Sequence, residues 1–267
     1  MRLKMELMAA LLAAFVIIQP AGGVTQDSSA AGDESLPALK LRIERAYWSE
    51  DIVSLRQSAE VLEATGIETT DWHGGYYLDF IYRKLAEIVI NRDKDRAKEY
   101  LEASVRSLER SLAIEPNAET YALLANSHGN RMGVTSLFGR LGVAGEAGQA
   151  LERAVEMDSL NPRVLLVDGV SRIYRPGFAG GGYKDARRKF ERALEVSIGW
   201  SETDTLMLAW GGTEDIYARW AELEIRNENA VNARRCIDYA LGLRPEFVLA
   251  SGKLTILLRE LETRMQE

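Results

Sequence analysis

Apolar residues recur at spacings of three and four from Leu36 to the end of the chain, whereas alternation of apolar and polar residues never persists. The first pattern is typical of amphipathic α-helices and the second of half-buried strands. The sequence therefore predicts an all-α chain. The expected helices span residues 36–48, 50–65, 75–91, 93–115, 117–129, 145–158, 162–174, 184–197, 213–226, 229–243 and 246–265, with a further short helix near 135–141.

Polar residues stand where several of these helices are expected to begin. Ser49, Asn117, Asn161 and Thr213 each precede a helical stretch, and Pro162 follows Asn161. Side-chain oxygens of this kind accept hydrogen bonds from the free amides of a helix N-terminus, and proline suits the first helical position. We expect these residues to mark the helix starts.

A motif of small, large and small residues at positions i, i+4 and i+7 returns in four predicted helices. These positions share one helix face, where small residues let a neighbouring helix approach closely. Since such helices cannot bury their apolar faces alone, the repetition predicts helical hairpins stacked in chain order. The four copies are Ser104-Leu108-Ser111, Ala147-Leu151-Ala154, Ala186-Phe190-Ala193 and Ala233-Ile237-Ala240, and prolines follow three of them, Pro116, Pro162 and Pro245.

This small, large, small and proline pattern resembles the second helix of the tetratricopeptide repeat (TPR) family, roughly from residue 75 to residue 250. The first helices match more loosely, for example at Tyr121, Ala125 and His128. The repeats here are longer than the family's unit, which implies enlarged loops. The resemblance implies a right-handed α-solenoid of TPR-like helical hairpins with a C-terminal capping helix. Similar exported bacterial proteins carry a Phe-Gly-Gly loop and a Trp-Gly pair, which correspond here to 178–182 and 210–211.

The N-terminus has the features of a secretory signal peptide. Arg2 and Lys4 precede the apolar stretch Leu7–Ile18, and Pro20 and small residues follow. Because this stretch is too short to span a bilayer, we expect residues 1–23 to be removed on export, with an uncleaved anchor as the alternative. Residues 24–35 then form a flexible leader and 36–267 the repeat domain, and we expect a periplasmic or secreted protein without stable membrane insertion after cleavage.

Composition narrows the chemistry. The net charge of −7 disfavours a nucleic-acid partner, because phosphate binding requires clustered Lys and Arg. Cys236 is the single cysteine and is expected to be a small buried residue, so no intrachain disulfide is expected. His73 and His128 are far apart in sequence, and Ser127 beside His128 points to a different side of its helix. We therefore predict no metal site, no cofactor and no enzymatic activity.

Three connections are longer than a simple link between helices requires. The loop "RPGFAGGGY", residues 175–183, lies within a predicted hairpin, so it does not fit a phosphate-binding loop, which follows a strand. Its glycines are expected to adopt positive φ angles and to permit close backbone approach. The connection 129–148 is similarly rich in glycine. In the third, 199–212, Trp200 and Trp210 either plug hairpin junctions or line a binding surface.

These features predict a non-enzymatic, exported TPR-like scaffold that binds a protein or peptide partner in the cell envelope through its concave surface and long loops. The candidate binding residues are Tyr174, Arg175, Phe178, Tyr183 and Trp210.

Two other functions stay open. The first is a small-molecule-binding accessory that resembles the T-component of tripartite periplasmic solute transporters. It would hold a small apolar ligand, and an apolar tunnel lined by Tyr and Trp would favour it. The second, a hydrolase, would require a cleft that holds either a carboxylate with a strongly perturbed pKa or His128 within hydrogen-bond reach of Ser127 or Ser171.

Overall fold

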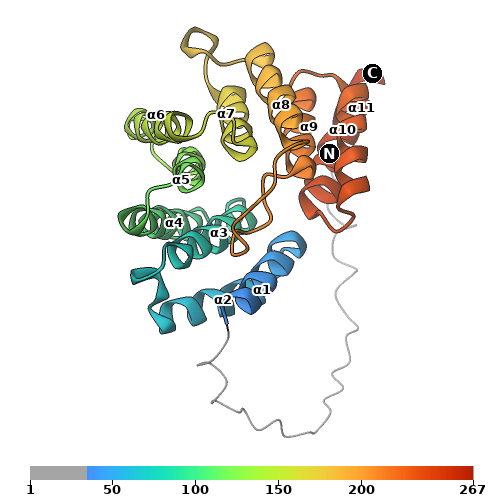
Figure 1. The fold of residues 1–267 in the computed structure, drawn as a ribbon. Helices are drawn as coiled ribbons and strands as arrows, with labels where there is room; N and C mark the ends of the chain where they lie inside the picture. Colours follow the sequence, from blue (N-terminus) through green and yellow to red (C-terminus); the bar gives the residue numbers. More distant parts are fainter. Residues whose placement is uncertain (1–34, 267) are drawn as a thin grey trace, which may run out of the picture. The chain divides into compact units, whose positions relative to one another are not determined.

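The computed structural model describes residues 35–266, and within that range the chain forms helices and loops without a β-strand (Figure 1). The all-α prediction is confirmed. The predicted signal peptide, and the leader up to residue 34, lie outside the described residues. The α-helices are α1 (Leu36–Ser49), α2 (Ile52–Thr65), α3 (Trp72–Val89), α4 (Lys94–Ile114), α5 (Ala118–Arg131), α6 (Arg140–Met157), α7 (Pro162–Tyr174), α8 (Tyr183–Ser197), α9 (Thr213–Arg226), α10 (Ala230–Leu243) and α11 (Thr255–Gln266).

Two of the predicted helix starts are capped as expected. The Asn117 side chain accepts a hydrogen bond from the Thr120 amide at 2.8 Å, and the Asn161 side chain accepts one from the Arg163 amide at 2.9 Å. Each bond satisfies an amide that has no partner within its own helix. α5 and α7 therefore begin where the sequence predicts.

The other two residues do not cap their helices, although α9 begins at residue 213 as predicted and α2 begins two residues later than predicted. Ser49 is the last residue of α1, and its hydroxyl donates to the Arg45 carbonyl at 2.8 Å. Asp51 caps α2 instead, since its carboxylate accepts from two amides of the first turn, both at 3.1 Å. Thr213 is the first residue of α9, and Gly212 precedes it without a side-chain bond. A carboxylate serves the cap of α2 better than the hydroxyl two residues earlier.

The helices pack as hairpins in chain order. α3 packs on α4, α5 on α6, α7 on α8 and α9 on α10, and each hairpin contacts the next through the pairs α4 and α5, α5 and α7, and α8 and α9. The repeated motif lies at these contacts: its members are buried except Ala147, which is half-buried. The structure therefore confirms stacked helical hairpins held together by the small residues of the motif.

The connection between α5 and α6 differs from the prediction. The separate helix expected near 135–141 is absent, and residues 132–139 form turns. α6 begins at Arg140 rather than at 145, because Val143 is buried and draws the first turns onto the hairpin. Glycine lowers helix stability but does not forbid a helix, and here the packing outweighs that cost.

The C-terminal helix also differs in detail. It opens with a π-helical turn, Leu249–Leu254, which continues into α11. Leu254, Leu258 and Leu261 are buried against the preceding hairpin, so this helix caps the stack as the resemblance implies.

The first helix meets the connection that follows α10, although the two are at opposite ends of the described chain. The rings of Trp48 and Phe247 pack edge to face with centroids 4.7 Å apart, and the Arg244 guanidinium lies 4.3 Å above the Trp48 ring. The row of hairpins is therefore curved strongly enough for its two ends to touch.

Residues 199–212, which connect α8 with α9, cross the middle of this curved row (Figure 1). We call this segment the strap. It bonds to α1 through Lys40, to α3 through Tyr77 and to α7 through Arg163. The inner surface, which the sequence offered as the place for a partner, is therefore covered by the chain itself.

Candidate functional site

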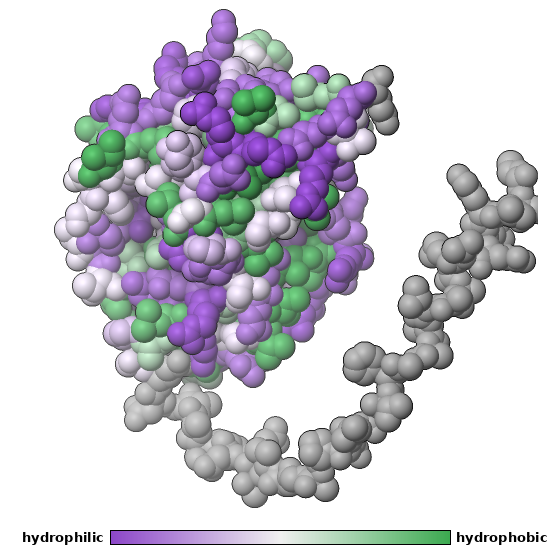
Figure 2. All heavy atoms as spheres, turned by 90° about the vertical axis from the view of Figure 1, so that its right-hand side faces the viewer, coloured by the Kyte–Doolittle hydropathy of each residue, from purple (hydrophilic) through white to green (hydrophobic). Residues whose placement is uncertain are grey.

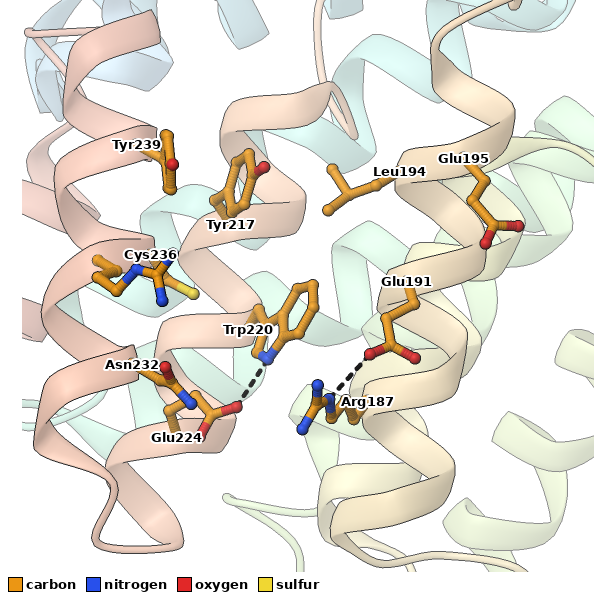
Figure 3. A pocket seen from close by; sticks show the side chains of 11 residues that line it. Arg187, Glu191, Leu194, Glu195, Tyr217, Trp220, Glu224, Asn232, Cys236 and Tyr239 are labelled. Atoms are coloured by element: carbon orange, nitrogen blue, oxygen red, sulfur yellow. Dashed lines mark hydrogen bonds and ion pairs between the residues drawn. The ribbon is translucent and has the colours of Figure 1, made fainter.

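A groove of about 500 Å³ lies between α8, α9 and α10 (Figure 3). α8 forms one wall, α10 the other, and α9 lies between them. The side chains of Leu194 and Trp220 point into the space between α8 and α9 (Figure 3). The lining residues are Arg187, Glu191, Leu194 and Glu195 of α8, Tyr217, Trp220 and Glu224 of α9, and Asn232, Arg235, Cys236 and Tyr239 of α10.

Aromatic rings supply the apolar part of the groove. Tyr217 and Tyr239 stack with ring centroids 5.0 Å apart, and Tyr239 remains 53% exposed. The Trp220 indole is half-buried, and its N–H donates to Glu224 at 2.8 Å. Rigid rings of this kind offer contact area at low entropic cost, so they suit a surface that receives another molecule.

Charges of both signs surround these rings. The Arg187 guanidinium lies 5.8 Å over the Trp220 ring and donates to Glu191 at 2.9 Å. Arg235 faces the groove from α10, opposite Glu191 and Glu195 on α8. The groove thus combines an aromatic floor with walls that can pair with either charge.

Cys236 lines the groove without being reactive. Burial raises the pKa of its thiol to about 12, with the Glu224 carboxylate as a further cause. The thiol is protonated at neutral pH, whereas nucleophilic cysteines require the thiolate. The prediction of a small buried residue is confirmed for Cys236.

One of the candidate binding residues, Tyr183, contacts a residue that lines this groove, whereas Tyr174 contacts another face of α9. The Tyr183 hydroxyl donates to the Glu224 carboxylate at 3.0 Å, which ties the end of the 175–183 loop to a groove residue. The Tyr174 hydroxyl donates to Glu222, and the Arg226 guanidinium lies 4.6 Å above the Tyr174 ring. Tyr174 therefore joins α7 to α9, and Tyr183 joins α8 to α9 at a groove residue.

The 175–183 loop itself reaches into solvent. Phe178 at its tip is 95% exposed. Gly180 and Gly182 have φ angles of 78° and 105°, and a Cβ at Gly181 would stand 1.9 Å from the Arg175 carbonyl oxygen. The glycines therefore provide the positive φ angles and the close backbone approach that the sequence predicts. The loop lies between α7 and α8, so it is the connection within a hairpin, as predicted.

The structure separates Trp210 from the other candidates. Its ring is only 7% exposed, and its indole N–H donates to the Tyr76 hydroxyl at 2.6 Å. Trp200, at the other end of the strap, stacks on the Arg163 guanidinium at 4.8 Å. Of the two roles considered for these tryptophans, Trp210 fills the interior and does not share a surface with Phe178.

A smaller hollow of about 350 Å³ lies in the equivalent place between α4, α5 and α6. His128 lines it, with its Nδ1 3.1 Å from Glu146, and burial lowers the pKa of this histidine. The Ser127 hydroxyl instead donates to Asp79 at 2.8 Å, inside the core. The pairing of Ser127 with His128 that a hydrolase would need is not formed.

The aromatic residues of the main groove were not among the sequence candidates. Tyr217 stood out only as a partial match to the repeat pattern, and Trp220 is one turn further along α9. Their spacing places them on one face of α9. Only the packing of α8 and α10 on either side turns that face into a groove.

No described helix has both the length and the apolar character needed to cross a membrane.

Comparison with models of known protein families finds no match, and neither does comparison with curated proteins. One similar solved structure is that of YrrB, described as a TPR protein with an unusual peptide-binding site. The two chains are 15% identical with a TM-score of 0.37, over 81% of this chain and 97% of YrrB. The described part of this chain is TPR-like in the sense that its own helical hairpins stack in chain order.

Proposed function

We propose that this protein is an exported, non-enzymatic scaffold of the cell envelope that binds a peptide segment of a partner protein. The observation that carries the proposal is the open groove between α8, α9 and α10. Export rests on the residue pattern of the first 23 positions.

The chemistry of the groove favours a peptide over a small apolar molecule. Its aromatic floor, formed by Tyr217, Trp220 and Tyr239, can hold apolar side chains, while Arg235 and Glu195 can pair with charges along a chain. The neighbouring face of α10 and α11 mixes apolar and polar side chains (Figure 2). A partner that carries both kinds of side chain fits such a surface best.

The 175–183 loop extends this surface. Phe178 is exposed at the loop tip, and Tyr183 connects the loop to Glu224 in the groove. Exposed aromatic residues on loops that a rigid scaffold holds in place are common binding determinants. We therefore keep Arg175, Phe178 and Tyr183 as a proposed rim of the site. We leave out Tyr174, because its contacts with Glu222 and Arg226 lie on another face of α9, and Trp210, because it is buried.

The small-molecule accessory is less well supported. That function predicts an apolar tunnel lined by Tyr and Trp, whereas the strap crosses the inner surface, with Trp210 hydrogen-bonded to Tyr76.

Site-specific photo-crosslinking in envelope extract tests the proposal. A photoreactive residue at position 239 is expected to capture a partner, and the same residue at position 138, on the exposed connection before α6, serves as the control. The captured partner is then titrated against the purified protein. Arg235→Glu and Phe178→Ala are each expected to weaken binding about tenfold or more, whereas Phe138→Ala leaves it unchanged. Equal affinity for all variants would overturn the assignment of the groove.

A further inference from the structure

The strap consists of two parts that are held in different ways. Its inner half, residues 207–212, is mostly buried, with Met207, Leu208 and Trp210 in the core. Its outer half, residues 199–206, is exposed or half-buried throughout. The two halves therefore differ in the free energy needed to detach them.

The inner half is anchored by the core. The Arg163 guanidinium donates to the backbone carbonyls of Trp210 and Leu208 at 2.8 and 3.2 Å. The Gly211 amide donates to the buried Asp215 carboxylate at 2.7 Å. Detaching this half would expose apolar surface and leave buried polar groups without partners, so it stays in place.

Polar contacts hold the outer half. The Glu202 carboxylate accepts from Arg163 at 2.5 Å, and the Asp204 carboxylate accepts from His73 Nε2 at 2.8 Å. The Thr205 carbonyl accepts from Lys40 at 3.1 Å, and the Leu206 carbonyl accepts from the Tyr77 hydroxyl. Each of these groups can be rehydrated at low cost when the outer half moves away.

His73 lies between two carboxylates. Its Nδ1 is 2.7 Å from Asp71, the N-cap of α3, and its Nε2 is 2.8 Å from Asp204 of the strap. Both ring nitrogens can donate only when the imidazole carries two protons. The neutral ring donates once and turns a lone pair toward the other carboxylate.

When the His73 ring is neutral, the hydrogen bond that is lost is the one to Asp204. Asp71 lies in the same turn as His73 and also accepts its backbone amide at 2.9 Å, so this contact is held locally. Asp204 joins α3 to a segment more than a hundred positions away, and its carboxylate is partly open to solvent. Loss of the proton therefore breaks the tertiary contact first.

Two aromatic rings lie beside His73, and a lysine of α1 reaches the same part of the strap. The Trp72 ring stacks on it at 3.9 Å, and the Tyr77 ring lies 6.3 Å away. From α1, Lys40 bonds the strap at Thr205 and pairs with Glu44 at 3.6 Å. Histidine is the side chain whose charge ordinarily changes between about pH 5 and 8.

We propose that the outer half of the strap is a proton-dependent latch, closed by the doubly protonated form of His73 through Asp204 and released when that form loses a proton. Release uncovers Tyr77 of α3 and the outward side of Arg163 of α7, while the inner half keeps the hairpins together. The latch concerns the inner surface and does not depend on the groove between α8 and α10.

The lowest pH at which the latch stays closed depends on the ionisation of Asp204. Burial opposes its ionisation, but the hydrogen bonds from the Leu206 amide and from His73 outweigh burial and lower the pKa of Asp204 below its ordinary value. On the acidic side, the latch therefore stays closed until Asp204 itself is protonated, at a pH below the ordinary pKa of an aspartate.

Amide hydrogen exchange, corrected for the intrinsic effect of pH, tests the latch on the purified protein. Between pH 5.5 and pH 8.5, the outer half, and above all the Leu206 amide that donates to Asp204 at 2.8 Å, should lose protection about tenfold. The inner half should keep its protection. Wild-type exchange in the outer half that does not vary with pH would overturn the proposal.

Three variants identify the residues responsible. His73→Gln and Asp204→Asn are each expected to give fast, pH-independent exchange in the outer half, with the inner half still protected as evidence of folding. His128→Gln, which changes the other histidine, should keep the wild-type response. Retention of the pH response in folded His73→Gln would also overturn the proposal. Trp200 fluorescence provides a second readout, because its ring leaves Arg163 when the latch opens.

Discussion

Single glycines and small residues set the distance between helices in this protein. Gly169 of α7 lies so close to α8 that a Cβ there would stand 2.5 Å from the Phe190 ring. Phe190 is itself fully buried and cannot move aside. The large residue of the repeated motif is therefore accommodated by the absence of a side chain on the facing helix.

Gly169→Ala is expected to destabilise the protein by about 1 to 3 kcal/mol, because the added methyl group overpacks the contact with Phe190. Gly145→Ala is the matched control. Gly145 also lies within a helix, α6, but a Cβ there meets nothing within 4 Å, so helix propensity alone should leave stability equal or higher. Urea unfolding of both variants checks the opposite signs, and equal effects would contradict the packing explanation.

A buried carboxyl makes stability depend on pH. Burial raises the pKa of Asp215 from 3.8 to about 6, although the Gly211 amide opposes this shift. Because the folded-state pKa lies above the unfolded one, proton binding stabilises the folded state at acidic pH. That contribution is lost as the pH rises from about 4 through about 6.

Asp215→Asn should therefore stabilise the protein at pH 8 by about 1 to 3 kcal/mol and change little at pH 4.5, where Asp215 is mostly protonated. The amide oxygen of Asn can still accept from Gly211. Chemical unfolding at the two pH values measures the difference, and Asp238→Asn on the exposed face of α10 is the control. A gain of the same size at both pH values would show that burial of the charge is not the cause.

Local sequence signals and tertiary packing both determine where each helix begins and ends. The sequence predicts most α-helices of the described part to within a few residues, because periodicity and caps depend on neighbouring residues. It misplaces the start of α6, where the burial of Val143 outweighs a run of glycines. It also places the cap of α2 at Ser49 rather than at Asp51, because neighbouring polar residues compete for the same amides.

The caps give a direct test at this scale. Asn117→Ala is expected to cost about 1 kcal/mol, since it removes the bond to the Thr120 amide. Thr213→Ala should cost clearly less, because Thr213 makes no capping bond at the start of α9. Thermal unfolding of the two variants, followed by circular dichroism, distinguishes the real cap from the one that sequence alone suggested.

At the scale of the molecule, contacts between distant segments close the row of hairpins. The ring of Trp48 in α1 packs against Phe247 and lies beneath Arg244, both beyond α10. The strap then fills the middle, from Lys40 in α1 to Arg163 in α7. These contacts join elements that are distant in sequence and do not follow one another in the row of hairpins.

Trp48→Ala should lower stability by about 3 to 5 kcal/mol, because a buried ring is lost from the closing contact. Hydrogen exchange is expected to rise in α1 and around Leu249–Leu254 together, although these segments are distant in sequence. Trp48→Phe, which keeps an aromatic ring, should retain most of the protection. Faster exchange in α1 alone would show that the closing contact does not couple the two ends.

The sequence by itself determined the helices, their pairing in hairpins and the Gly-rich loop, because these depend on periodicity, caps and glycine conformations within a few residues. Only the tertiary structure decided which surfaces are open. Trp210 and Phe178 are both large aromatics in long loops, yet one is buried against Tyr76 and the other is exposed. The groove and the strap arise from contacts between segments far apart in the chain, and no local pattern encodes such distances.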